Sequence, residues 1–436
     1  MPLNSKVMTA IEQLNYRVTV GDVAVQSGLD LQVAQQALMA LASEAGGHLQ
    51  VTETGEVAYL FSPNFRTILQ AKFFKLRLLN LWQRIWGVLF YLIRISFGIL
   101  LIASICIIAI AILLIVLATV FKDSDNSDNG GSSNSGGFSG FPIAWMFSDW
   151  FYFFSPSPYG TPRTPASFSS KASQHSSMNF LEAVFSFLFG EGNPNQNLEE
   201  RRWQLVGQTL RYNQGAVIPE QVAPFLDGVD AGQTIDDAML PVLLRFNGQP
   251  EVSPEGEIVY YFPELQTSVG SSQTAPRVPF LQEAAWRFSS ASSGQVMAAM
   301  GLGGVNLVGA LALGRLLSDS AGLGGFLGFV QAIYPVLLVY GLGFLAIPLG
   351  RHFWNQWQNQ RIGDRNQRRE RLAQQFAQSK AQLQAKLGFA RQFAKATRVD
   401  DLDLVYTTET DLLDQEAKNQ AAIDAEWQRR IDRSGH

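Results

Sequence analysis

The sequence predicts a mainly α-helical membrane protein that combines transmembrane helices, two winged-helix-like (α+β) repeat domains and a long C-terminal amphipathic helix. Three observations predict this class. Several long segments carry almost no charge, a motif at residues 51–61 recurs at residues 252–262, and a basic amphipathic stretch follows the last apolar segment. Charged residues make up only 16% of the 436 residues, against about 25% in typical soluble proteins, so the apolar residues are concentrated in particular segments.

The repeated motif predicts a β-hairpin in each copy. VTETGEVAYLF at residues 51–61 matches VSPEGEIVYYF at residues 252–262 without a gap, and each copy alternates apolar residues on either side of a glycine turn. Helical segments precede each hairpin, so we expect the order helix, turn, helix, hairpin in two domains, 1–66 and 199–268. The predicted helices are 7–15, 20–27 and 30–45 in the first copy and 199–212, 219–226 and 234–246 in the second.

The charge of these repeats argues against nucleic acid as a partner. Winged-helix modules that read DNA place the last helix before the hairpin in the major groove, where Lys and Arg contact phosphates. Residues 30–45 carry no basic side chain, and carboxylates outnumber cations in both copies. We therefore expect the repeats to bind proteins.

The first apolar segment predicts a transmembrane helix at residues 95–121, because about 20 apolar residues suffice to cross a bilayer. Residues 67–94 mix Lys and Arg with Trp, Phe and Tyr, which favours an interfacial amphipathic helix, the alternative being a simple extension of the span. Residues 122–177 are expected to form a flexible linker with an aromatic segment at the membrane interface, and residues 178–198 a short amphipathic segment.

Residues 296–349 predict a transmembrane helical hairpin, broken at residues 318–320. The segment is rich in small residues, which allow helices to approach closely in lipid. Asn306 is the one amide within a span, so we expect it to face protein. Close packing within the hairpin, a contact between subunits of a homo-oligomer and a pore lining all fit the small residues, of which we single out Gly309, Gly314 and the GxxxG pair Gly324 and Gly328.

After the last span the chain turns basic. Residues 351–399 predict a long amphipathic helix, which would lie on anionic lipid, form a coiled coil, cover the acidic repeats or remain solvated. Residues 400–436 are acidic and predict a separate docking segment. Our candidate interaction residues are the tryptophans and arginines at the start of this arm: Trp354, Trp357, Arg361, Arg365, Arg368, Arg369 and Arg371.

Positive charge near both ends of the membrane region creates a conflict over topology. Cytoplasmic loops are enriched in Lys and Arg, yet Arg84 and Arg94 precede the first span and Arg351 follows the third, and three spans would place these ends on opposite sides. We expect an even number of crossings, with a hidden one at residues 141–154 or within a divided run 79–121.

Neither metal nor cofactor chemistry is predicted. Cys106 is the only cysteine and lies inside an apolar run, so the chain has no set of thiolates for zinc or an iron–sulfur cluster. The four histidines lack metal-ligand spacing. We expect no cleavable signal at the N-terminus. We expect no cofactor and no enzymatic activity.

Several segments together resemble an uncharacterised family of cyanobacteria and plant chloroplasts. They are the paired hairpin motifs, MNFLEAVFSFLFGEGNPNQNLEERRW from Met178, LPVLLRFNGQPE from Leu240 and VYTTETDLLDQE from Val405. The resemblance implies a thylakoid, plasma or envelope membrane. Plant members sometimes carry an iron–sulfur cluster biosynthesis label, which the lone Cys106 does not support. We expect a membrane-anchored adaptor or scaffold for assembly of a photosynthetic membrane complex, binding membrane lipids and complex subunits, or alternatively a channel or transporter subunit.

Overall fold

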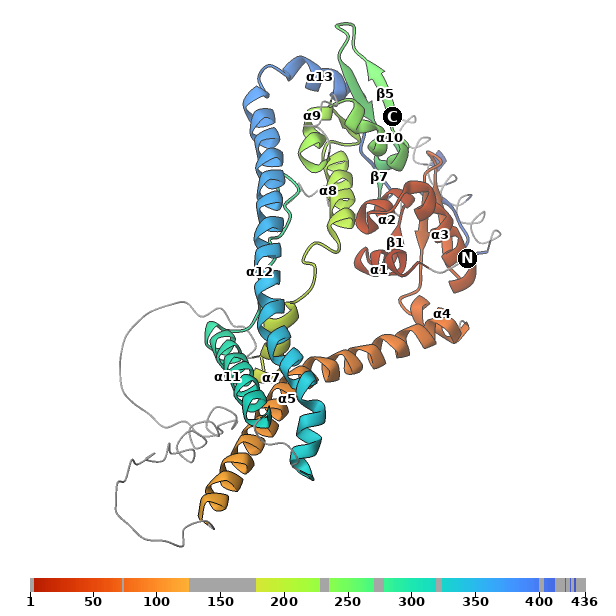
Figure 1. The fold of residues 1–436 in the computed structure, drawn as a ribbon. Helices are drawn as coiled ribbons and strands as arrows, with labels where there is room; N and C mark the ends of the chain where they lie inside the picture. The colour runs from red at the N-terminus through yellow and green to blue at the C-terminus, as the bar shows by residue number, and fades with distance from the viewer. Residues whose placement is uncertain are drawn as a thin grey trace, which may run out of the picture. The chain divides into compact units, whose positions relative to one another are not determined.

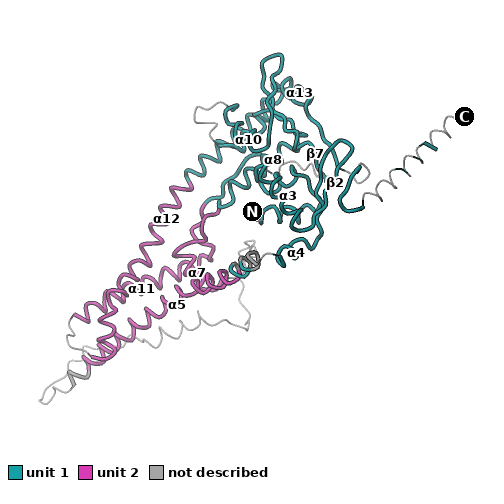
Figure 2. Tube along the Cα trace, turned by 90° about the vertical axis from the view of Figure 1, so that its right-hand side faces the viewer, with its two compact units in different colours: residues 1–82, 195–285, 360–436 teal, residues 83–194, 286–359 magenta. Residues whose placement is uncertain are grey.

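The computed structural model describes residues 4–72, 74–124, 178–227, 235–269, 278–318, 324–399 and 404–411, with residues 420, 424, 427 and 428. The predicted linker beyond residue 124, the proposed crossing at 141–154 and most of the acidic C-terminal segment lie outside these residues. The chain is mostly helical and divides into two compact units (Figure 2). Unit 1 comprises residues 1–82, 195–285 and 360–436, and unit 2 comprises residues 83–194 and 286–359.

The first repeat, in unit 1, consists of three helices and a small sheet. Its helix boundaries follow from capping: Asp30 accepts from the Gln32 amide at the start of the third helix, as the sequence predicts, and Thr19 forms a capping box with Asp22. The elements are α1 (Ser5–Gln13), β1 (Arg17–Val18), α2 (Val20–Ser27), α3 (Leu31–Ala45), β2 (His48–Thr52) and β3 (Val57–Leu60), and the strands are ordered β1-β3-β2 (Figure 1).

The second repeat has the same order of elements and the same hairpin register, since Val252 pairs with Ile258 as Val51 pairs with Val57. Its second helix is shorter than predicted because Pro224 interrupts it, and its third begins only at residue 237. The elements are α8 (Leu198–Tyr212), β4 (Ala216–Val217), α9 (Pro219–Val222), η1 (Ala223–Phe225), η2 (Asp237–Met239), α10 (Leu240–Phe246), β5 (Gln249–Val252) and β6 (Ile258–Tyr261), followed by η3 (Pro263–Leu265) and β7 (Thr267–Ser268).

The two repeats share one hydrophobic core. Helix α2 of the first packs on α8 of the second, and a Cβ added at Gly207 would lie 2.9 Å from a methyl group of Val25. Arg211 of α8 pairs with Asp22 of α2, and both side chains are largely buried. The repeats, expected as separate domains, therefore form a single packed body.

The predicted interfacial helix and span correspond to helices α4 (Phe65–Lys72) and α5 (Phe74–Ser124). Helix α5 is continuous over 51 residues, about 76 Å at ~1.5 Å per residue. Residues 74–94 thus extend the span rather than forming a helix of their own, because no proline interrupts their helix-forming residues. The same continuity excludes a division of the run 79–121.

In unit 2, α5, α11 (Ser293–Ser318) and α12 (Phe326–Ser379) pack together, and α7 (Phe180–Phe189) packs on them at one end. Three helices in the described residues are long and apolar enough to cross a membrane: residues 84–120 of α5, α11 and α12. At one end of the bundle Ile115 packs with Leu317, near the end of α11, and Leu327, near the start of α12. At the other end Leu101, Ala299 and Phe344 pack with α7.

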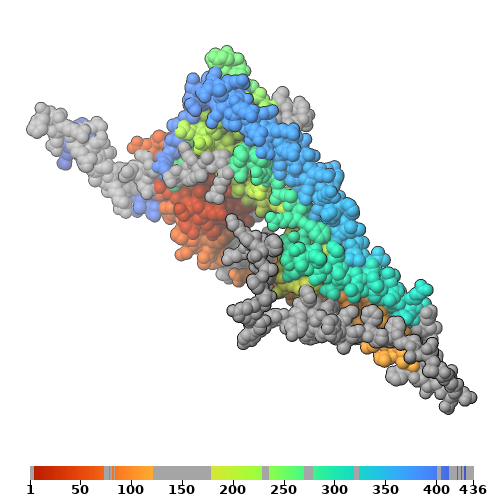
Figure 3. Space-filling view, turned by 90° about the vertical axis from the view of Figure 1, so that its left-hand side faces the viewer, coloured from red at the N-terminus to blue at the C-terminus, as the bar shows by residue number. Residues whose placement is uncertain are grey.

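The C-terminal arm covers the repeats. The predicted single helix 351–399 is instead the end of α12, a turn and α13 (Gln384–Gln392), since α12 runs on from the span to Ser379. Then β8 (Thr397–Arg398) pairs in parallel with β7, and β9 (Leu404–Thr407) adds a fourth, antiparallel strand to the first repeat's sheet, beside β2. Figure 3 shows α13 in blue against the green second repeat.

Candidate functional site

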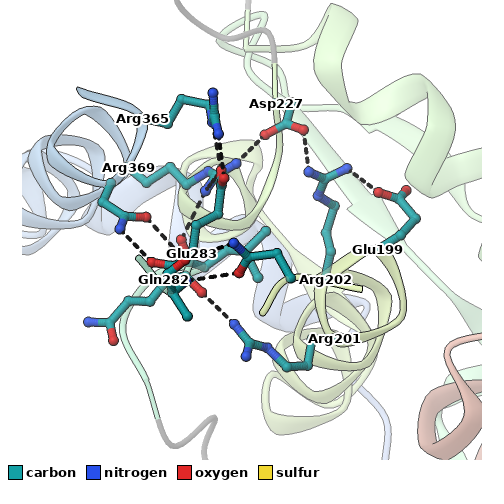
Figure 4. A network of polar contacts seen from close by, with 12 residues as sticks. Glu199, Arg201, Arg202, Asp227, Gln282, Glu283, Arg365 and Arg369 are labelled. Atoms are coloured by element: carbon teal, nitrogen blue, oxygen red, sulfur yellow. Dashed lines mark hydrogen bonds and ion pairs between the residues drawn. The ribbon is translucent and has the colours of Figure 1, made fainter. Parts of the chain in front are cut away.

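A cluster of ion pairs fastens the arm to the second repeat (Figure 4). Glu283, in the last part of the unit 1 segment 195–285, accepts hydrogen bonds from Arg365 Nε at 2.8 Å and Arg369 Nη1 at 2.8 Å. Arg369 also donates to Asp227 at 2.6 Å. The side chains of Glu283 and Arg369 are each only 5% exposed. Arg202 of α8 extends the cluster by pairing with Asp227 and Glu199.

In this cluster the positive charges of the arginines are paired with the negative charges of the carboxylates. Burial alone would raise the pKa of the Glu283 carboxyl, but hydrogen bonds and charge from Arg365 and Arg369 outweigh it and hold that pKa below its usual value. Both arginines are therefore engaged within the chain. The selection of Arg365 and Arg369 as residues that contact a partner stays a prediction. The sequence gives no sign that Glu283 lies opposite them.

The other candidate residues of the arm remain exposed. Arg361, Arg368 and Arg371 are exposed on α12. In unit 2, Trp354 and Trp357 are 54% and 42% exposed, with ring centroids 5.3 Å apart. Such rings at the end of a span suit the headgroup region of a bilayer.

A second attachment holds α13 on the sheet of the second repeat. Lys386 Nζ lies 2.9 Å from Glu220 and 3.3 Å from Glu257. Burial would lower the pKa of Lys386, but these two carboxylates outweigh it and raise that pKa. Ala390 packs beside the pair on Ile218 and Val259. Of the alternatives for the arm, the described residues therefore favour the one in which it covers the acidic repeats.

The third helix of each repeat presents no basic side chain to the outside. Leu240 and Leu244 of α10 are 58% and 73% exposed on one helix face. Arg245 is turned inward, where it donates to the Gly28 carbonyl and stacks over Trp203 at 4.4 Å, and burial lowers its pKa. This apolar face is not evident from the sequence, because leucines four apart on a helix ordinarily mark its buried side.

Within unit 2, Asn306 faces protein, as expected from the sequence. It is 1% exposed, and its Oδ1 accepts from Ser104 Oγ of α5 at 3.0 Å. Its Nδ2 has no hydrogen-bond partner among the described residues. Asn306 thus joins α11 to α5.

The glycines of the hairpin separate into two groups. A Cβ added at Gly309 would lie 3.0 Å from Ile108, and one at Gly314 would collide with the Tyr334 hydroxyl, so both permit close packing. Gly324 precedes the first residue of α12, and a Cβ there would meet nothing within 4 Å. The GxxxG pair of Gly324 and Gly328 therefore does not lie on one helix face, since only Gly328 is helical.

Two arginines from different helices converge on the C-terminal end of α7. Arg351 of α12 donates to the carbonyls of Ser186 at 3.3 Å and Phe187 at 3.0 Å, supplying partners to the last turn of the helix. Arg94 of α5 pairs with Glu191 at 3.0 Å. The two positive clusters that conflict in the sequence thus lie at the same end of the bundle.

No group of three or more His, Cys, Asp or Glu side chains suited to a metal ion occurs in the part of the chain that the structure describes.

The chain is similar in sequence to an uncharacterised chloroplastic protein of Arabidopsis thaliana, At5g03900. The two chains are 37% identical over 446 residues, which cover 98% of this chain and 82% of the relative. The chain belongs to the family of this plant protein. No family model matches the chain, and no solved structure matches it.

Proposed function

We propose that the protein is a membrane-anchored adaptor for the assembly or maintenance of a photosynthetic membrane complex, in a cyanobacterial thylakoid or plasma membrane. We interpret each repeat as a winged-helix-like module, on the order helix, strand, helix, helix and hairpin. The chloroplastic relative supports a photosynthetic membrane, and the three apolar helices support an integral anchor. The iron–sulfur label of plant relatives is not part of the proposal.

The observation that carries this proposal is the apolar face of α10. A winged-helix module that binds DNA uses Lys and Arg on its third helix. Here Leu240 and Leu244 occupy the exposed face, and Arg245 is held inside by Gly28 and Trp203. Asp236 and Asp237 lie exposed at the start of the same segment. The face fits a protein segment that presents apolar side chains beside Lys or Arg.

Replacement of the two leucines tests the adaptor. Because both are exposed, Leu240→Ser with Leu244→Ser should leave the fold intact. A native pull-down from solubilised membranes, read by mass spectrometry, should recover partners with the unaltered chain and lose them with this variant. Met39→Ser on α3 is the matched control, since Met39 is 50% exposed at the corresponding helix of the first repeat. Equal recovery with the α10 variant, or no stable partner for the unaltered chain, contradicts the proposal.

The topology that we propose places both repeats and the arm on one side, with an even number of crossings. Residue 124 ends α5 at the end of the bundle where Ile115 meets Leu317. Met178 lies at the opposite end, where its carbonyl accepts from Gln295 Nε2 at 2.6 Å. We therefore propose that the chain returns across the membrane between residues 124 and 178. A further crossing there would put both repeats on one side of the membrane, as their shared hydrophobic core requires.

Cysteine labelling tests the topology. In a Cys106→Ala background, single cysteines at the exposed turn positions Thr54 and Glu255 should react equally with a membrane-impermeant maleimide in sealed vesicles. Opposite accessibility of the two positions would overturn the proposed topology.

One observation favours the alternative of a channel or transporter subunit. The buried Asn306 Nδ2 has no partner among the described residues, and unpaired polar groups in a membrane are often functional. Flux through the reconstituted protein should then fall in Asn306→Leu. Flux that is unchanged in this variant would exclude the mechanism and leave Asn306 as a packing residue.

A further inference from the structure

A cavity of about 760 Å³ lies within unit 1, between the second repeat and the C-terminal arm. Its walls come from the end of α8, from η1, from the last turns of α12 and from α13. This volume is in the range of sites that hold small molecules, about 300–1,000 Å³. The question is why the fold leaves this space and what it would accept.

The cavity exists because the arm is fastened on either side of it. Arg365 and Arg369 hold α12 through Glu283, and Lys386 holds α13 through Glu220. Between these attachments α12 presents mainly small side chains, among them Ala373 and Ala377, to the second repeat. The arm therefore bridges the space without filling it.

The charges that line the cavity are of one sign. Lys380 and Arg391 line it, and its lining contains no carboxylate. The three buried or half-buried cations of the arm nearby, Arg365, Arg369 and Lys386, are paired with carboxylates. Both residues are exposed, and the side chains of Lys380 and Arg391 make no hydrogen bond or ion pair with any residue that the structure describes. In a chain of net charge −4, two cations without a side-chain partner at the edge of one space of mixed polarity favour an anion.

The remaining lining is mixed, as an amphipathic ligand requires. Phe376 and Leu387 line the space with apolar surface, and Tyr212 offers a hydroxyl. We propose that this cavity binds a single-chain amphiphile with an anionic head, such as a long-chain fatty acid, its head held by Lys380 and Arg391 and its chain on Phe376 and the alanines of α12. The site is distinct from the partner face of α10, and the proposal is independent of the proposed adaptor function.

Photocrosslinking of the full chain in lipid nanodiscs tests this assignment. The probe is a long-chain fatty acid that carries a diazirine in its chain. Crosslinks should map to peptides that contain residues 209–225 and 373–394. Lys380→Gln with Arg391→Gln should lower labelling of these peptides by about tenfold or more, the effect expected from lost hydrogen bonds to charged groups. Ala377→Trp should lower it by filling the space.

Arg371→Gln is the matched control, because Arg371 is an exposed cation of α12 outside the cavity lining. It should leave labelling unchanged. Excess unlabelled lauric acid should compete with the probe, whereas its methyl ester and inorganic phosphate should not. Competition by phosphate alone would indicate a simple anion site and overturn the proposal. Crosslinks confined to α5, α11 and residues 326–349, or equal labelling in the Lys380 and Arg391 variant, would overturn it as well.

Discussion

Glu283→Gln should destabilise unit 1, since it removes the negative charge at the centre of the arm's ion-pair cluster. Glu283 is 5% exposed on its side chain and is shared by Arg365 and Arg369. Removal of one partner from a buried ion pair costs about 3–5 kcal/mol, because it leaves a buried charge uncompensated.

The lower end of that range applies here. Arg369 keeps Asp227 at 2.6 Å and the Leu281 carbonyl at 3.2 Å, and Arg365 is 38% exposed and can be rehydrated. We expect a loss of about 3 kcal/mol. For a unit of roughly 150–250 residues, this corresponds to a fall of about 6–12 °C in unfolding midpoint.

Thermal unfolding of the purified full chain, followed by tryptophan fluorescence, measures this loss. Glu255→Gln serves as the matched control, because Glu255 lies exposed in the hairpin turn of the second repeat and should change stability by no more than about 0.5 kcal/mol. Hydrogen exchange of the α13 amides should accelerate in Glu283→Gln as the arm loosens. A midpoint shift no larger than that of the control would refute the assignment of Glu283 as the residue that fastens the arm.

Three further predictions concern Glu283, Gly207 and β9. The folded-state pKa of Glu283 is lowered, so the stability that its carboxylate contributes is complete above its unfolded pKa of about 4.3 and is lost as pH falls through the folded value. The pH dependence of the unfolding midpoint below about pH 4.3 should therefore be weaker in Glu283→Gln than in the unaltered chain. Gly207→Val should cost about 1–3 kcal/mol, because its side chain would collide with Val25 between the repeats; an unchanged denaturation midpoint would contradict the shared core. Proline at both Tyr406 and Thr407 should release β9 from β2 and speed hydrogen exchange of residues 48–52, and unaltered exchange there would refute the added strand.

The sequence by itself determined the local features of this protein. Uncharged runs identify α5, α11 and the first part of α12 as helices able to span a membrane, because crossing a bilayer depends only on length and polarity. The matched motifs at 51–61 and 252–262 predict two hairpins of the same register, because alternation and a glycine turn are encoded in neighbouring residues. Asp30 as a helix cap belongs to the same group.

Only the tertiary structure decided which distant residues meet. The sequence leaves four alternatives open for the basic arm, and the position of Glu283 and Glu220 opposite Arg369 and Lys386 decides between them within unit 1. The tertiary structure also shows that α10 exposes Leu240 and Leu244, although helical periodicity favours their burial. Charge and periodicity describe what a segment can bury or pair with. The partner that it finds depends on contacts between residues far apart in the chain, and these exist only once the chain has folded.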